Sequence, residues 1–506
     1  MIGIFNTPLI KRAGKNLERR AIITSEGVFT YQDLLITSSK VASCLLDGAD
    51  DLQESRVAFL TPPGFQYVAL QWGIWRAGGT AVPLSVLHSR PELEYVIENS
   101  DAAILVAHPE FEARLRPVAV AQGLRFLLTT AALNAEQTAL PEVEVNRRAM
   151  ILYTSGTAGK PKGVVTTHKN IEVQVKSLIS AWEWTPKDHI LNILPLNHIH
   201  GIINVLTCAL WAGATCEILP KFDAEEVWAL ILKGDLTLFM AVPTIYVKLI
   251  ASWEATSPRR QKALSAACSR MRLMVSGSAA LPVSVIEAWK TISGHVLLER
   301  YGMTEIGMAL SNPLHGQRVP GYVGTPLPNI KVRLVDEKGK SVKPESPGEI
   351  QVKGPGVFLE YWRKPDMTKN AFREGWFSTG DIAVIENGIY RILGRSSVDI
   401  IKTGGYKASA LEIEDVLRTY PDIKDCAVVG LEDLEWGERV GAAIVLKDGS
   451  DLTLDSLRKW AKERLAVYKI PTQILVINDL PRNEMGKISK PEVAQLFKDR
   501  KGTEGT

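Results

Sequence analysis

The alternation of helical and β-rich segments in the first 150 residues most constrains how this chain can fold. Short β-rich runs occupy 55–62, 80–85 and 102–109, and the segment 65–79 between the first two carries apolar residues at helical spacing and ends on two glycines. Strands separated by helices of about 10–15 residues are typical of βαβ units. The pattern therefore predicts an α/β fold with a mainly parallel sheet.

The pattern changes in the last third of the chain. Residues 316–395 are rich in glycine, proline and alternating β-formers, which predicts a small, mainly antiparallel β subdomain. After residue 395 a new α+β unit begins. We expect a large N-terminal domain over 1–395 that includes this β subdomain, and a small, mobile C-terminal domain over 396–506.

Charge and cysteine content exclude several classes of protein. The 59 Lys and Arg residues nearly balance the 56 Asp and Glu residues, so the chain has no global field for nucleic acid. The five cysteines form no C-x-x-C pair, which argues against a disulfide framework and a zinc site. The longest apolar stretch, 201–216, falls short of the ~18–20 residues that a membrane helix needs and predicts a buried helix.

The N-terminal segment carries no pattern of a secretory signal, because its short apolar stretch precedes the basic residues. Its arginines and lysines leave a weak resemblance to a transit peptide. We expect a cytoplasmic location, with the mitochondrial matrix as the alternative.

The segment 153–163, YTSGTAGKPKG, combines hydroxyls, glycines and two lysines directly after a strand-like run. Glycines let backbone N–H groups approach an anion closely, so this chemistry suits a polyphosphate. Pro161 follows Lys160, so the segment does not match a Walker A loop. A flexible surface loop is the alternative. The candidate phosphate-binding residues are Thr154, Ser155, Gly156, Thr157, Gly159, Lys160 and Lys162.

The segment resembles the phosphate loop of the adenylate-forming superfamily, which includes acyl-CoA synthetases, luciferases and nonribosomal-peptide adenylation domains. Six further motifs of that superfamily follow in the same order and extend the resemblance over nearly the whole chain. They lie at Leu194–Gly201, Ser276–Ala280, Tyr301–Glu305, Ser378–Asp381, Gly394–Tyr406 and Pro481–Lys487.

The resemblance implies an enzyme that uses ATP, Mg²⁺ and CoA, and it assigns roles to the matching residues. Tyr301 would stack on adenine, Asp381 would bind the ribose and Arg395 the ribose or a phosphate. Glu305 would hold Mg²⁺ that bridges the ATP phosphates, and Lys487 would stabilise charge on the α-phosphate. The remaining residues of these motifs that we assign to nucleotide binding or catalysis are Ser276, Gly277, Ser278, Gly302, Met303 and Thr304.

The superfamily alternates between two half-reactions by rotating its C-terminal domain just after the Gly-Arg pair. By that spacing we expect the hinge at Ser397, where many relatives carry Asp or Lys. After rotation, Gly405 would approach pantetheine and Lys407 would meet a CoA phosphate.

Arg300, directly before Tyr301, bears on the acid that the enzyme takes. An arginine in an acyl pocket is costly unless it meets an anion, and its fork fits a carboxylate. The surrounding segment, LLERYGMTEIGMALSNPL, resembles malonyl-CoA synthetases, including a branch that accepts methylmalonate. His200 is a candidate second donor and His198 a candidate gate. A salt bridge of Arg300 to Glu299 and a core histidine at 200 are the alternatives.

The sequence therefore predicts a ligase that joins a dicarboxylic acid to CoA. The alternatives are a medium-chain or aryl acyl-CoA ligase, an adenylation enzyme that loads a carrier protein, and a non-catalytic nucleotide sensor. The sequence ends about twenty residues after Lys487, from which we expect a stand-alone synthetase. We expect small-molecule substrates, no nucleic acid, no membrane insertion and no obligatory protein partner.

Overall fold

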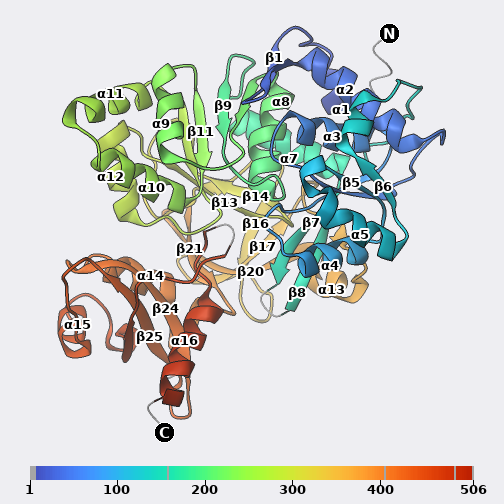
Figure 1. Cartoon of the computed structure of the whole chain (residues 1–506). Helices are drawn as coiled ribbons and strands as arrows, with labels where there is room; N and C mark the ends of the chain where they lie inside the picture. The colour runs from blue at the N-terminus through green and yellow to red at the C-terminus, as the bar shows by residue number, and fades with distance from the viewer. Residues whose placement is uncertain (1–6, 157–158, 404–405, 484–485, 504–506) are drawn as a thin grey trace.

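The computed structural model of the chain describes residues 7–156, 159–403, 406–483 and 486–503. Figure 1 shows a large body built from the N-terminal and central parts, with a smaller unit below it that carries the C-terminus. The sequence-predicted Thr157 and Gly405 lie outside the described residues. The two units and the seam between them position the candidate site.

Two large sheets form the main body, and the first has seven strands. Its central pairs β7–β4, β4–β3, β3–β5 and β5–β6 are parallel, whereas β8 pairs antiparallel with both β7 and β18. In spatial order the strands are β18 (Glu360–Tyr361), β8 (Gly159–Thr167), β7 (Arg148–Gly156), β4 (Thr80–Pro83), β3 (Arg56–Leu60), β5 (Ala102–Ala107) and β6 (Arg125–Leu128).

The second sheet has nine strands and is parallel through its centre, from β1 to β13. Its edges are antiparallel, at β2 on one side and at β14 and β15 on the other. In spatial order the strands are β15 (Thr325–Pro326), β14 (Gly307–Ser311), β13 (Leu298–Met303), β12 (Leu273–Ser276), β11 (Leu238–Ala241), β9 (His189–Asn192), β10 (Thr215–Ile218), β1 (Arg20–Thr24) and β2 (Gly27–Thr30).

Helices cover both large sheets, as parallel strands joined by crossovers require (Figure 1). They are α1 (Pro8–Ala13), α2 (Tyr31–Leu46), α3 (Phe65–Arg76), α4 (Arg90–Ser100), η1 (Pro109–Phe111), α5 (Glu112–Gln122), α6 (Thr129–Asn134), α7 (His168–Ala181), η2 (His200–Thr207), α8 (Cys208–Ala212), α9 (Ala224–Lys233), α10 (Pro243–Glu254), α11 (Pro258–Cys268) and α12 (Val283–Ser293).

A smaller antiparallel sheet follows and lies next to the C-terminal unit. It contains β16 (Lys331–Val335), β17 (Gly348–Lys353), β19 (Phe372–Arg373), β20 (Trp376–Glu386) and β21 (Ile389–Arg395), with α13 (Pro365–Ala371) beside it. Its bounds lie within the β subdomain that we expected over 316–395. It places Asp381 opposite Arg395 on neighbouring strands.

The last unit is an α+β layer with its own core. A five-stranded sheet packs against α14, with Ile413, Leu417, Val428 and Ile444 fully buried between them, and α16 packs against β24 through a second buried cluster that includes Val493. Its elements are β22 (Ile400–Thr403), β23 (Tyr406–Ser409), α14 (Ala410–Leu417), β24 (Ile423–Asp433), β25 (Gly437–Leu446), α15 (Leu454–Ala461), η3 (Val467–Lys469), β26 (Gln473–Val476) and α16 (Lys490–Thr503).

The α/β fold class that the sequence predicted is confirmed, with its large first part and small last part. The buried segment after residue 200 differs from a simple helix. It is a π-helix from His200 to Thr207 that continues as α8, and the N–H of Cys208 donates to the carbonyl of Ile203, five residues back. π-Helical turns are rare and often mark functional sites.

No helix among the described residues is long and apolar enough to cross a membrane.

Candidate active site

The predicted phosphate loop is the turn of the β7–β8 hairpin. Strand pairing runs along the hairpin and ends with Gly156 opposite Gly159. The Thr154 hydroxyl is buried and has no hydrogen-bond partner among the described residues. The side chain of Ser155 lies outside the described part. The Lys160 ammonium lies 5.2 Å from the ring centroid of Tyr95 and stays exposed, so it is accessible to an anion.

Lys162 and Glu305 meet inside the main body. The Lys162 ammonium lies 3.0 Å from the Glu305 carboxylate, and the Tyr361 hydroxyl donates to the same carboxylate at 2.9 Å. The ammonium also sits 4.1 Å from the Tyr361 ring centroid. Glu305 is almost fully buried, and the buried carboxylate stays compensated because two donors reach it. Tyr361 is a member of the site that the sequence analysis missed, because it lies outside every quoted motif.

Glu305 can supply only part of the ligands of a magnesium site. Among the described residues, no three His, Cys, Asp or Glu side chains are grouped closely enough to hold a metal. Mg²⁺ is commonly bound by one or two carboxylates together with substrate phosphates. Glu305 can supply one such oxygen, and ATP would have to supply others.

Tyr301, Asp381 and Arg395 form a connected chain at the junction with the C-terminal unit. The Tyr301 hydroxyl donates to one oxygen of the Asp381 carboxylate at 2.6 Å, and Arg395 Nε donates to the other at 3.0 Å. Burial, then the Asp381 charge, raises the pKa of Tyr301. The ring is therefore fixed by its hydroxyl, and the carboxylate is fixed between two donors.

The strand β13 carries Tyr301 and turns sharply after Met303. A Cβ on Gly302 would collide with the carbonyl of Gly307 across the β13–β14 pair, so glycine is required there. Met303 ends the strand, and Thr304 lies in the turn that leads to Glu305.

The loop after β12 approaches Arg300 at van der Waals distance. A Cβ on Gly277 would lie 2.7 Å from both Cζ and Nε of Arg300, so any larger residue there would displace the guanidinium. Ser278 has φ +71°, a left-handed conformation that costs a non-glycine residue about 1–3 kcal/mol. Such strain is typical of functional loops. Ser276, at the end of β12, has a buried hydroxyl without a hydrogen-bond partner among the described residues.

Arg300 is buried without a compensating acid. Its side chain is only 3% exposed, and no carboxylate in the described part of the chain forms an ion pair with it. Among the described residues, its Nη2 donates a long hydrogen bond to Ser278 Oγ at 3.5 Å. Burial lowers its pKa to about 9, well below the ordinary value of a guanidinium. A guanidinium held this way is ready to meet an anion.

The proposed alternative of a salt bridge to Glu299 is not what the structure contains. Successive side chains of a strand point to opposite faces, so Glu299 and Arg300 on β13 diverge. Glu299 instead accepts from the N–H of Gly321 at 2.9 Å. Burial raises its pKa to about 8.

His200 lies beside Arg300 at the start of the π-helix. Its Nδ1 is 3.2 Å from Ser278 Oγ, and its Nε2 has no hydrogen-bond partner among the described residues. Burial, followed by the charges of Arg300 and Lys487, lowers its pKa well below 6.5, so the ring is neutral at pH 7. If Nδ1 accepts from Ser278, then Nε2 carries the proton and can donate to a carboxylate.

His198 lies two residues earlier and is half-buried. Burial, the Lys487 charge and His88 together lower its pKa to about 4. Both histidines are therefore uncharged donors near a group of cations.

Lys487 reaches this group from the C-terminal unit. The pKa of Lys487 is lowered to about 8, first because protein atoms around its ammonium displace water and then because of the positive charges of Arg395 and Arg300. The negative charge of Asp381 acts in the opposite direction and raises this pKa. Residue 487 is nevertheless exposed in the described structure, so its ammonium is accessible to a bound anion. The preceding Gly486 faces Thr244 of α10, since a Cβ there would lie 2.8 Å from Thr244 Oγ1. The structure thus brings together Lys487, Arg300, Arg395 and Asp381.

The residues predicted for hinge and CoA lie elsewhere. Ser397 is exposed in the turn 396–399, between β21 and β22. The carbonyl of Arg395 accepts from both Val398 and Asp399 and so shapes this turn. Lys407, on β23, forms an exposed ion pair with Glu337 of the β subdomain at 2.8 Å. The structure does not bring Lys407 to the Lys487 cluster.

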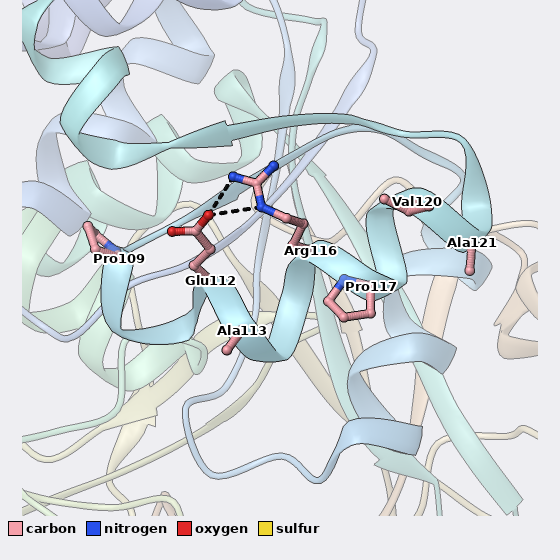
Figure 2. Close-up of a pocket in the computed structure, with 7 residues that line it drawn as sticks. All are labelled: Pro109, Glu112, Ala113, Arg116, Pro117, Val120 and Ala121. Carbon is pink, nitrogen blue, oxygen red and sulfur yellow. Dashed lines mark hydrogen bonds and ion pairs between the residues drawn. The ribbon is translucent and has the colours of Figure 1, made fainter.

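Figure 2 shows a separate hollow on the surface of α5. An exposed ion pair between Glu112 and Arg116 borders it, and the rest of the lining is small or apolar. None of the candidate site residues lines it.

Comparison with known proteins shows the family to which the chain belongs. Residues 9–362 match the family described as AMP-binding enzyme, and residues 412–487 match the AMP-binding enzyme C-terminal domain. The chain is 46% identical to the protein named malonate–CoA ligase ACSF3, mitochondrial, of Homo sapiens, over 97% of this chain and 92% of that protein.

Solved structures agree with this assignment. ATP-bound MatB from Rhodopseudomonas palustris matches with a TM-score of 0.91 and 33% identity, over 98% of this chain and 99% of that one. The apo form of the same protein matches with a TM-score of 0.80 at 34% identity, over the same shares. The described arrangement, with Lys487 beside Arg395, is thus nearer to the ATP-bound form. From its length of match, its motifs and its fold, the chain belongs to the family of AMP-binding enzymes.

Proposed function

We propose that this enzyme joins malonate to CoA through a malonyl-adenylate. The observation that carries the proposal is Arg300, a buried cation with no acidic partner among the described residues, flanked by His200 and Ser278. A second carboxylate on the substrate would compensate that charge. The names of the human relative and of other similar proteins from mouse and Arabidopsis thaliana, all malonate–CoA ligases, support the same acid.

In the first half-reaction one carboxylate of malonate attacks the α-phosphorus of ATP. The bond to the β-phosphate breaks and pyrophosphate leaves. Charge develops on the α-phosphate oxygens, and the Lys487 ammonium is placed to stabilise it more in the transition state than in the ground state. Arg300 and His200 would hold the other carboxylate and so orient the attacking one.

The nucleotide would be held by residues already in contact with one another. Tyr301 presents an aromatic face, and Asp381 can accept from ribose hydroxyls where it now accepts from Tyr301 and Arg395. Lys160, Lys162 and Thr154 line the phosphate side. Mg²⁺ bound to ATP and Glu305 would neutralise phosphate charge.

In the second half-reaction the CoA sulfur attacks the acyl carbon, the thiol proton is released and AMP leaves. Lys487 occupies the seam between the two units in the described arrangement, so we propose that residues 396–506 rotate against 1–395 about Ser397 to open a thiol route. That rotation would separate Lys407 from Glu337 and free its ammonium for a CoA phosphate. Gly405, outside the described residues, stays a candidate for the pantetheine path.

Pyrophosphate exchange tests the proposal directly. The wild-type chain is assayed with malonate, methylmalonate, succinate, acetate, octanoate and benzoate, and thioester formation is then measured with CoA. We expect malonate to give the highest kcat/KM, with CoA as acceptor. Equal or better exchange with octanoate or benzoate would favour the medium-chain or aryl ligase, and adenylation without transfer to CoA would favour a carrier-protein acceptor.

The location in the cell is a second proposal. The sequence favours the cytoplasm, whereas the human relative is named mitochondrial. We propose the mitochondrial matrix wherever the host cell has one, and fractionation of cells that express the full-length chain decides between the two compartments.

A further inference from the structure

Asn204 is a buried polar residue that the reaction described above does not use. Its side chain is fully buried in the π-helix η2. Neither its amide nitrogen nor its amide oxygen has a hydrogen-bond partner among the described residues. Buried polar groups without partners are rare in native proteins, and each one calls for an explanation.

Asn204 lies on the same face of the helix as His200. Residues four apart share a face in a helix, and the wider π-helical turn keeps them close in direction. His200 points toward Ser278, with 3.2 Å between Nδ1 and Oγ. Asn204 therefore lies on the helix face that carries His200, about one turn, or ~5 Å, further along the helix axis.

The unpartnered donors around this pocket match what a carboxylate requires. An ionised carboxylate accepts about four hydrogen bonds. Arg300 Nε and His200 Nε2 are buried donors without partners in the described part of the chain, and the Asn204 amide adds a third. Together with a terminal nitrogen of Arg300, these groups would supply four donors from three side chains.

We infer that Asn204 is a further acid-binding residue, whose amide N–H donates to the distal carboxylate of the substrate beside Arg300 and His200. The inference rests on the proposed function and deepens it, because it defines the end of the acid pocket as polar. A short dicarboxylate fits such a pocket, whereas an acid with an apolar tail would leave these four donors unpaired.

The test uses full-length Asn204→Leu, which has a similar volume and no donor. We expect kcat/KM for malonate to fall about 10–100-fold, because one hydrogen bond to a charged group is lost. This loss should appear mainly as a higher KM for malonate, with the KM for ATP unchanged. Exchange with acetate and propionate should not fall, since neither acid reaches the amide. The thermal midpoint should stay the same or rise, because an unsatisfied buried amide is replaced by an apolar group.

Asn204→Asp is the second variant, because it keeps the shape and replaces the donor with an acceptor. We expect a loss with malonate at least as large as that of Asn204→Leu. Thr207→Val is the matched control on the same helix. Its hydroxyl already donates to the carbonyl of Ile202 at 2.7 Å, so the control should lose thermal stability and keep its preference for malonate over acetate.

Two results would overturn the inference. If Asn204→Leu lowers the thermal midpoint and reduces exchange with every acid equally, the amide has a structural role and an ordered water satisfies it. If the ratio of malonate to acetate exchange is unchanged, the amide does not reach the substrate. Either result, with a wild-type enzyme that prefers malonate, leaves the proposed function intact. A wild-type enzyme that does not activate malonate rejects the proposed function itself.

Discussion

Replacing Arg300 by methionine should separate the stability of this enzyme from its choice of acid. The substitution keeps the length and packing of the stem and removes the charge. The charge belongs to a guanidinium whose residue is 3% exposed and which forms no ion pair in the described part of the chain. If Arg300 serves folding, its replacement should lower stability. If it serves substrate binding, its replacement should lower activity with malonate and leave stability unchanged or higher.

The effect on stability can be worked from the structure. Burial lowers the pKa of Arg300 to about 9, well below its ordinary value, which corresponds to about 5 kcal/mol against the charged form at about 1.36 kcal/mol per pKa unit. Because the pKa in the fold is below that in the unfolded chain, this cost is fully present below pH 9 and disappears as the pH rises toward the ordinary pKa of a guanidinium. Replacing buried ion pairs by apolar side chains of similar volume is often neutral or stabilises a protein by about 1–4 kcal/mol. Arg300→Met removes a buried charge that has no acidic partner in the described part of the chain, so we expect its thermal midpoint to rise at pH 7.

The effect on activity should be large and selective. Sites built around a polar partner discriminate by up to ~10⁴–10⁵ between ligands that have that partner and ligands that lack it. We expect kcat/KM for malonate in pyrophosphate exchange to fall by about 10³-fold or more. Exchange with acetate or butyrate should be retained or improved, because the uncompensated charge is gone.

The matched control is Arg318→Met. Arg318 is a partly buried arginine whose guanidinium donates to the carbonyls of Pro313, Val296 and Leu314. Its loss should lower stability and leave acid preference unchanged. The reasoning about Arg300 is refuted if Arg300→Met keeps malonate activity within tenfold of wild type, or if it destabilises the enzyme as the control does.

Three further predictions concern Lys487 and the proposed hinge. Lys487→Ala should lose about 100-fold or more in adenylation while thioester formation from preformed malonyl-AMP survives, and equal loss in both half-reactions would reject its role. The pKa of Lys487 near 8 means that its charge is lost as the pH rises through 8, so kcat/KM for adenylation should fall above that pH, and Lys487→Arg should remove this limb of the profile if the lysine causes it. Ser397→Pro should slow the complete reaction more than pyrophosphate exchange, and normal rates in both assays would argue against a hinge there.

The sequence predicted the fold class and the set of residues that converge, because motif order and spacing carry that information. Lys487, Arg395 and Asp381 do meet, although no local pattern links them. The sequence could not predict which partner each side chain takes. Tyr361 beside Glu305 depends on the pairing of β18 with β8, and that pairing is tertiary.

The pattern of apolar and polar residues could not predict details of the backbone conformation either. The apolar run after His200 predicts a helix, but its period cannot distinguish α from π turns. The left-handed Ser278 is equally hidden, since serine rarely adopts this conformation and no turn signal marks it. Asn204 was missed because a single asparagine in an apolar run is an interruption in the pattern until its burial is known.

The contact between Gly277 and Arg300 limits the order in which acid preference can change over evolution. A methyl group at position 277 would lie 2.7 Å from the guanidinium, so Gly277→Ala would displace the guanidinium while the arginine is present. Once Arg300 has become small, the same alanine fills space that the guanidinium vacated. The effect of a substitution at either position therefore depends on the residue at the other. An alanine at 277 would move a returning arginine away from its present position, so a lineage that has lost the second carboxylate would regain it with a displaced guanidinium.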